Sequence, residues 1–420
     1  MVDFAQLRDA KPDLWQTAAD DWLTLAKEAE QSARDIYDNG ASALDEHWTD
    51  QVGQHAGQTL KDLANLFEVA AVEIRAVVST LDGLADAAKL AQSSLHSAVD
   101  YAQRSGMVVD GSGHVTMSDP RTMHNDPDAQ QLRGESQRLI DEAVAEATRI
   151  DQDASTELNR LKDAVGVTDL DKAMNEIGAQ ASQNEVKLMA DALPTDQDAQ
   201  TVAAWWNGLT PQQRDEFARA VPVQLYDLNG IPQDVKDQLK GNYGYDRVEL
   251  VRWAQANWDN KDIDIFDNNC TQFVSTGLEH AGMKQTMSDW TGTFDDDGWG
   301  HGGQTGWDWL DKHDHSHTDS WASADANRNF MVSHGGQTIP LNQARPGDIV
   351  YFEQAGPGGP TDPGKVHHAA IVTSVTPDGD IHYTQHTDSR LNVSLNDRLP
   401  HNEVTEGDQN IVIVRPHPNY

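Results

Sequence analysis

The sequence is poor in cysteine and in positive charge, and it has no long hydrophobic run. A single cysteine, Cys270, stands among 420 residues, so no disulfide can form within the chain. Sixty-eight acidic residues against 31 basic ones give a net charge of -37, which argues against a surface that binds nucleic acid. No stretch approaches the length of a membrane span. We therefore expect neither a nucleic acid partner nor a membrane-spanning segment.

The first residues, "MVDFAQLRDAKPDLW", lack the basic start and the apolar core of a secretory signal peptide. If the protein leaves the cell, we expect it to be cytoplasmic first. Export to the medium or the cell wall would then follow a route that needs no signal peptide.

The length and the changes in composition predict several domains. With 420 residues and 38% hydrophobic residues, the chain can form two or three cores. We expect a helical hairpin at 1–105, a helical extension and linker at 106–195, a Trp-rich helical connector at 196–242 and an α+β domain at 243–420. The connector is expected from paired Trp205 and Trp206, a helix start at Thr210-Pro211 and a turn at Gly230.

Apolar residues at alternating spacings of three and four predict two long helices near the N-terminus. Asn39 and Gly40 are expected to end the first helix, and Trp48 to close the apolar end of an antiparallel pair. A third stripe follows the loop "SGHVTMSDPRTMHNDPD" and predicts one more helix. The three stripes are Trp15, Ala18, Trp22, Leu25, Ala29 and Ile36; Leu60, Leu63, Phe67, Ala70, Ile74, Val77, Leu81, Leu84, Ala88, Ala91, Leu95, Ala98 and Ala102; and Leu132, Leu139, Ala143, Ala147, Ile150, Ala154 and Leu161.

The N-terminal pattern resembles the WxG-type helical hairpins of type VII (ESX-like) secretion substrates. In those proteins a Trp-x-Gly turn joins two helices, and here the turn reads Trp48-Thr49-Asp50. The resemblance implies a secretion-system partner or a second helical hairpin as partner. An ordinary coiled-coil spacer remains the alternative, because a helical pattern predicts the type of element and not its role.

The single cysteine lies where a polar turn meets an amphipathic helix, in "NNCTQFVSTGLEHAGM". Phe273, Val274, Gly277, Leu278 and Ala281 predict the buried face of that helix, which places the thiol in the first helical turn. Free N–H groups and the helix dipole at this place stabilise a thiolate and can hold an oxyanion. We interpret the thiol as a nucleophile, with Asn269 and Thr271 at the helix start. A buried structural thiol is the alternative.

Three short β-like runs follow, at 347–352, 368–375 and 380–386, and they predict an antiparallel meander. His368 opens the second run, and His386 ends the third. A thiolate needs a base nearby, and that base needs a partner on its other ring nitrogen. Cys270, His368 and His386 offer such a set.

The motifs "YDRVELVRWAQANW", "NNCTQFVSTGLEHAGM", "RPGDIVYF", "HHAAIVTSV" and "YTQHTDSR" resemble the putative amidase domain family, amidase family six. Its members are papain-like cysteine hydrolases related to the NlpC and CHAP cell-wall enzymes. The resemblance implies that Cys270 is the nucleophile, His368 the general base and His386 the third polar residue. The family commonly has Asp directly before the cysteine, where this chain has Asn269.

Other residues compete for two of these roles. His367 is the alternative base, although alternation along a strand turns it to the opposite face. His382 and Asp388 compete with His386. A solvent-facing histidine is the alternative for each of these positions.

His313, His315 and His317 alternate in "HGGQTGWDWLDKHDHSHTD" and could present three metal ligands from one extended face. The spacing matches no closed zinc pattern, so we expect neither a metal site nor a cofactor. Trp290, Trp299, Trp307 and Trp309 are expected to line a groove or to pack the same segment.

The expected architecture is an all-α hairpin or bundle with long antiparallel coiled-coil-like helices, followed by an α+β papain-like domain. The resemblance implies a cysteine-dependent amidase or peptidase that cleaves the peptide part of peptidoglycan. Two alternatives stay open. The protein could be a secreted effector or toxin that cuts amide bonds in a target protein. It could also be a non-enzymatic, partner-binding protein with a degenerate hydrolase domain.

Overall fold

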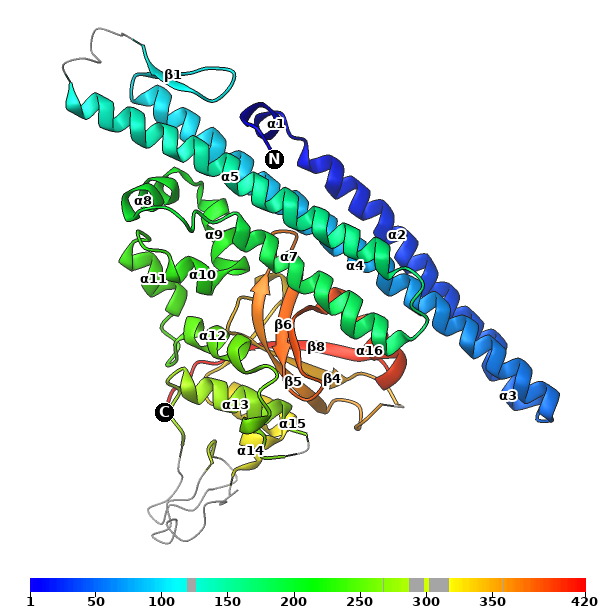
Figure 1. Cartoon of the computed structure of the whole chain (residues 1–420). Helices are drawn as coiled ribbons and strands as arrows, with labels where there is room; N and C mark the ends of the chain where they lie inside the picture. Colours follow the sequence, from blue (N-terminus) through cyan, green and yellow to red (C-terminus); the bar gives the residue numbers. More distant parts are fainter. Residues whose placement is uncertain (119–125, 267, 287–297, 302–316, 358) are drawn as a thin grey trace. The chain divides into compact units, whose positions relative to one another are not determined.

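The computed structural model describes residues 1–118, 126–266, 268–286, 298–301, 317–357 and 359–420 (Figure 1). The chain forms two compact units, Met1–Arg214 and Asp215–Tyr420. The boundary falls inside the Trp-rich connector expected at 196–242, and the four-segment division stays a prediction. Within the described ranges, no helix combines the length and the apolar character that a membrane crossing needs.

The first unit is almost entirely helical, which confirms the helical N-terminal region. A two-stranded hairpin, β1 and β2, interrupts it. Its elements are α1 Phe4–Arg8, α2 Pro12–Ile36, the π-helical segment η1 Tyr37–Ala41, α3 Ser42–His47, α4 Gln51–Arg104, β1 Met107–Val109, β2 Val115–Met117, α5 Pro127–Ala164, α6 Leu170–Lys172, the π-helical segment η3 Ala173–Gly178, α7 Ala179–Asp191 and α8 Ala199–Gly208.

Helices α2 and α4 form the expected antiparallel pair and run side by side in Figure 1. Glu30 of α2 pairs with Arg75 of α4, and Gln16 of α2 bonds to Asp82 of α4. The contact with the higher residue number in α2 has the lower residue number in α4, so the two helices are antiparallel. Most of the apolar residues that α4 buries are alanines. Alanine has the highest helix propensity, and its small side chain lets neighbouring helix axes come close.

The turn between the two helices differs from the sequence prediction. Asn39 and Gly40 do not end the helix, because the chain continues through η1 and α3 as far as His47. A Cβ on Gly40 would lie 3.0 Å from Leu60 Cδ1, so the glycine serves a close approach to α4 rather than a helix end. Trp48 is 44% exposed and does not close the apolar end. Asp50 caps α4 by accepting hydrogen bonds from the N–H groups of residues 52 and 53.

The all-α prediction is also wrong at the loop before α5. The antiparallel strands β1 and β2 pair Met107 with Met117 and Val109 with Val115. The helix predicted from the third stripe is present as α5, which buries Leu139, Ile150 and other residues of that stripe.

The second unit contains a mixed set of helices around one antiparallel sheet. Its elements are α9 Pro211–Ala220, which crosses the unit boundary, α10 Pro222–Asp227, α11 Gln233–Lys240, α12 Arg247–Asn257, the 3₁₀ helix η4 Lys261–Ile263, α13 Cys270–His280, α14 Asp319–Ala322, α15 Ala324–Ser333, β3 Gln337–Ile339, the 3₁₀ helix η5 Leu341–Gln343, β4 Ile349–Gln354, β5 Val366–Val375, β6 Ile381–Gln385, β7 Arg390–Ser394, α16 Leu395–Glu406 and β8 Gln409–Arg415.

The sheet has the strand order β3-β8-β4-β5-β6-β7, with every pair antiparallel. It contains the predicted meander as β4, β5 and β6. Residues of alternate parity face opposite sides of such a sheet. One side packs Ile349, Tyr351, Ala369 and Ile371 into a core with α12 and α13. In Figure 1, α12 and α13 lie together on one side of these strands, and α16 lies on the other.

A buried ion cluster joins α12 to the sheet. Asp348 is fully buried and accepts hydrogen bonds from Arg247 at 3.0 Å and from Arg415 at 2.8 Å. Gly347 precedes it with φ 86°, and a Cβ there would lie 2.9 Å from Arg247 Cβ. The "RPGD" motif is therefore a turn that only glycine fits and that aims Asp348 at two arginines.

Candidate active site

Cys270 is the first residue of α13, as the sequence predicted, and it is 4% exposed. Its neighbours Asn269 and Thr271 are buried with it. Asn269 holds the cap position but makes no side-chain cap hydrogen bond. Its side-chain oxygen accepts from the Thr387 hydroxyl at 2.6 Å, and its backbone N–H donates to the same hydroxyl at 2.9 Å. The first-turn N–H groups of α13 are thus left without the cap that an asparagine ordinarily provides.

His368 of β5 lies close enough to the Cys270 thiol for the two groups to shift each other's pKa. Burial raises the pKa of that thiol, but the charge and hydrogen bond of His368 and the N–H of Ala369 outweigh it. Together with the Thr271 hydroxyl, 3.7 Å from Sγ, they lower the pKa of Cys270 to about 7. Burial alone would lower the pKa of the His368 imidazole. The charge and hydrogen bond of Cys270 outweigh burial, so the pKa of His368 is raised. Each group therefore favours the charged form of the other.

Gln385 of β6 is the partner of the other ring nitrogen. Its Oε1 accepts from His368 Nε2 at 2.9 Å, which leaves Nδ1 for the thiol. The amide nitrogen of Gln385 donates to the carbonyls of Thr387 and Asp388, both at 3.1 Å. Because two acceptors hold the amide nitrogen, the amide oxygen faces His368. The ring orientation of His368 is therefore fixed from the sheet.

The sequence analysis missed Gln385 and assigned its place to His386. In the structure His386 stacks on Phe273, with ring centroids 5.3 Å apart. Its Nε2 bonds to Asp264 at 2.5 Å, and its Nδ1 donates to the Trp258 carbonyl at 2.7 Å. With both nitrogens occupied, His386 has none left for His368. It braces the end of β6 against α13 instead.

The sheet register explains this correction. Strand β5 pairs with β6 as far as Ile371 and Thr384, and the same register continued by one residue sets Ala370 opposite Gln385. His368 shares the face of Ala370, two residues along the strand, and a long side chain at 385 reaches it diagonally. His386 belongs to the opposite face, with the α13 core. Alternation along the predicted third strand could have indicated this from the sequence, because it places residues 385 and 386 on opposite faces of the sheet.

The other candidates have partners of their own, although His367 and Asp388 line a cavity that His368 also lines. His367 bonds to Gln409 at 2.7 Å, and His382 is buried against the Asn392 carbonyl. Asp388 is exposed and contributes its backbone carbonyl to Gln385. Of the three alternating histidines that were considered as metal ligands, His317 packs edge-on against Phe266. His313 and His315 lie outside the described residues, as do Trp290, Trp307 and Trp309. The remaining member of that group, Trp299, is fully buried.

The turn after β6 connects both halves of the site. Thr387 and Asp388 have φ values of 66° and 49°, in the left-handed region that residues other than glycine seldom adopt. Thr387 binds Asn269 beside the thiol, and the carbonyls of both turn residues bind Gln385 beside the base. These hydrogen bonds hold the strained turn in place. Thr387 was not predicted from the sequence.

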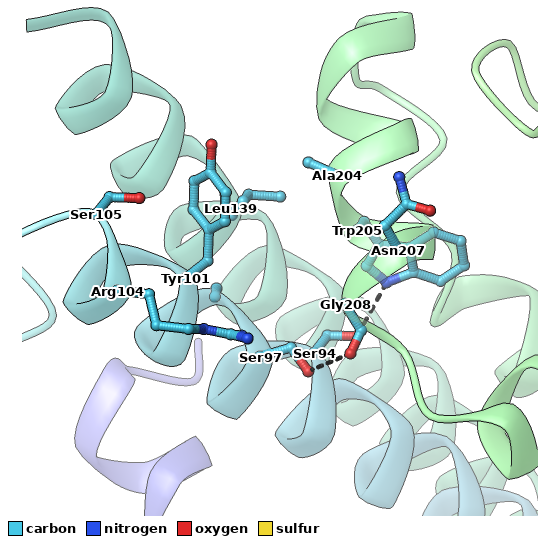
Figure 2. A pocket seen from close by; sticks show the side chains of 11 residues that line it. Ser94, Ser97, Tyr101, Arg104, Ser105, Leu139, Ala204, Trp205, Asn207 and Gly208 are labelled. Atoms are coloured by element: carbon cyan, nitrogen blue, oxygen red, sulfur yellow. Dashed lines mark hydrogen bonds between the residues drawn. The ribbon is translucent and has the colours of Figure 1, made fainter. Parts of the chain in front are cut away.

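Two cavities in the structure differ in their chemistry. One of about 590 Å³ in the first unit is lined by residues of α4, α5 and α8 (Figure 2). Its Ser94 accepts from the Trp205 indole, and its Ser97 donates to the Gly208 carbonyl, so both serines serve helix packing. None of its lining residues is a cysteine, a histidine or an acid. The second cavity, of about 400 Å³, is lined by His368 and Gln385 and lies beside the thiol pair.

Residues 244–412 match the family model described as "Putative amidase domain". The range contains Cys270, His368 and Gln385, and the match supports an amide hydrolase activity for this part of the chain. It confirms the amidase resemblance predicted for the C-terminal region. The WxG resemblance of the hairpin stays a prediction. Neither a curated protein nor a solved structure matches the chain.

Proposed function

We propose that the second unit is a papain-like, thiol-dependent amide hydrolase in which Cys270 is the nucleophile and His368 the general acid and base. The placement of Cys270 at the start of α13 beside His368, with the pKa of the thiol lowered to about 7, is the observation that carries this proposal. Gln385 holds the His368 ring in its orientation. The family match at 244–412 supports the reaction class.

In the proposed reaction the Cys270 thiolate attacks the carbonyl carbon of the scissile amide. The uncapped N–H groups at the start of α13 stabilise the oxyanion that forms. The His368 imidazolium gives its proton to the departing amine, and an acyl-thioester remains on Cys270. Neutral His368 then takes a proton from water, which attacks the thioester and releases the carboxylic acid.

The pH dependence of Cys270 alkylation by iodoacetamide tests the pair. A group whose pKa is lowered ionises earlier as pH rises, so in the wild type the rate should climb through about pH 7. In His368→Ala, burial would raise the pKa of Cys270 without the opposing charge of His368. The rise in alkylation rate should then occur above about pH 8.5, the ordinary pKa of a thiol. The chain has no other cysteine, so every alkylation event reports this thiol. An identical titration in both proteins would sink the proposal.

We further propose the peptide part of peptidoglycan as the substrate, supported by the resemblance to NlpC and CHAP cell-wall enzymes. Purified walls, native and delipidated, should release soluble muropeptides with the wild type. The Cys270→Ala variant should release at least about a thousandfold less, because removing the nucleophile leaves only residual catalysis. Release that is equal with both proteins, or absent from both types of wall, would contradict this substrate.

We also propose that the protein is exported to the wall or the medium by a type VII route. The antiparallel α2 and α4 hairpin, whose turn carries Trp48-Thr49-Asp50, supports a type VII route. Fractionation of the producing cells tests this, since the protein should be found outside the cytoplasm.

A further inference from the structure

The cavity beside His368 has a wall that leads away from the thiol toward α16. Phe352 lies opposite His368 in the sheet register, with ring centroids 5.5 Å apart, and Tyr383 lies 5.7 Å from Phe352. Alternation puts Phe352, His368, Tyr383 and Gln385 on one face of the sheet. Arg398 of α16 completes the lining on this face. The aromatic wall therefore connects the base to a cationic side chain.

Arg398 is more than nine-tenths buried, with 9% of its surface exposed. Its Nε and Nη1 atoms are buried and have no hydrogen-bond partner among the described residues. Burial raises the pKa of Tyr383 and the charge of Arg398 opposes this rise, so the guanidinium lies near the Tyr383 hydroxyl. A buried charged group with unused N–H donors is costly, and such a group in a native protein calls for an explanation. A bound anion would use these donors.

The other charged residues around the cavity are Glu406, Arg390 and Asp388, and the charge of Glu406 also acts on His368 and Tyr383. Glu406 Oε2 lies 4.0 Å from His367 Nδ1, and Arg390 has interactions of its own. Asp388 is exposed at the rim. Arg398 is therefore the lining residue with unused donors. Its forked guanidinium matches a carboxylate better than a lysine would.

We propose that Arg398 binds a carboxylate of the substrate, so that the enzyme prefers peptides that carry a free carboxylate near the scissile amide. This inference rests on the hydrolase function proposed above, since peptide substrates present carboxylates as their anionic groups. The net charge of -37 repels anions, so a preference for acids would have to come from a local site.

The test uses matched pairs of thiol reagents of increasing length. Each pair has a free carboxylate in one member and a carboxamide in the other: iodoacetate and iodoacetamide, N-iodoacetylglycine and its amide, N-iodoacetyl-diglycine and its amide. Second-order rates for modification of the single thiol are measured by intact mass. For at least one spacer length, the wild-type protein should react about tenfold faster with the acid, the value of one charged hydrogen bond. Dividing the two rates cancels any general change in thiol reactivity.

Arg398→Met should reduce this ratio to one or below, and Arg398→Lys should give an intermediate ratio. Arg345→Met is the matched control, because Arg345 pairs with Asp215 and does not line the cavity. It should retain the wild-type ratio. Acid-to-amide ratios at or below one for every spacer in the wild type, or equal ratios in wild type and Arg398→Met, would overturn the inference while leaving the hydrolase proposal intact. A thiol that none of the reagents modifies would overturn both.

Discussion

The two units bury charge in different ways. In the first, Glu30 and Arg75 connect two neighbouring helices, and the Glu30 side chain keeps 14% of its surface exposed. In the second, Asp348 is fully buried, and its two arginines come from α12 and β8, about a hundred and about seventy residues away along the chain. The Glu30–Arg75 pair adds to the packing of α2 against α4, which the apolar faces of the two helices already make. The second cluster brings together elements that nothing local would join.

The same contrast applies to the interiors of the two units. Helix α4 packs mainly through alanines along one repeated stripe, whereas the core of the second unit contains Trp253, Phe273, Trp299 and Tyr351. A small-residue seam repeats the same contact many times. A core of large aromatics depends on each side chain fitting its neighbours. The thiol pair lies in the second kind of environment, where the loss of one buried group should be felt over a long range.

The largest effect on stability is expected from Asp348→Asn. The amide would leave the buried Arg247 and the partly buried Arg415 without their counter-charge, which costs about 3–5 kcal/mol. Hydrogen exchange at increasing denaturant, read by mass spectrometry over β4 and β8, measures the loss in this unit alone. Asp215→Asn is the matched control, since Asp215 is 44% exposed and should cost less than about 1 kcal/mol. Equal losses for the two variants would mean that the burial of Asp348 adds nothing to what its ion pairs contribute.

Local periodicity predicted much of the fold. The stripes located α2, α4 and α5, the apolar face of 273–281 located α13, and alternation located β4 to β6. It also favoured His368 over His367, and these two histidines do bond to different strands. These features depend on residues close together in the sequence, so one sequence is enough to predict them.

What the sequence could not supply depends on contacts between distant residues. Gly40 looks like a helix end, but the approach of Leu60 makes it part of a continuing helix. Gln385 carries no titratable group, so a search for acids and bases passed over it, although the sheet register brings it to His368. Thr387 acquires its role because a strained turn places its hydroxyl on Asn269. In each case the partner lies in another element.

A smaller effect, on the thiol, is expected from Gln385→Ala. Losing the acceptor of His368 Nε2 should lower the pKa of His368 and weaken its stabilisation of the thiolate. We expect the rate of alkylation by iodoacetamide at pH 7 to fall about fivefold, as for a one-unit rise in the pKa of Cys270 from about 7.

Gln385→Glu distinguishes two roles of Gln385: positioning the His368 ring, and supporting the Thr387–Asp388 turn. The glutamate keeps an acceptor for His368 but cannot donate to the carbonyls of Thr387 and Asp388. If Gln385 positions the base, this variant should keep an alkylation profile that rises near pH 7. A profile displaced as far as that of Gln385→Ala would mean that the turn, and not the histidine contact, controls the thiol.

The smallest effect is expected from Glu30→Gln in the first unit. The amide oxygen can still accept from Arg75 Nε, so the loss should be about 1 kcal/mol. Hydrogen exchange over α2 and α4, under the conditions used for Asp348→Asn, measures it. A loss as large as that from Asp348→Asn would mean that the helix seam depends on this ion pair as strongly as the second unit depends on its own. Packing of alanines alone would then not account for the stability of the hairpin.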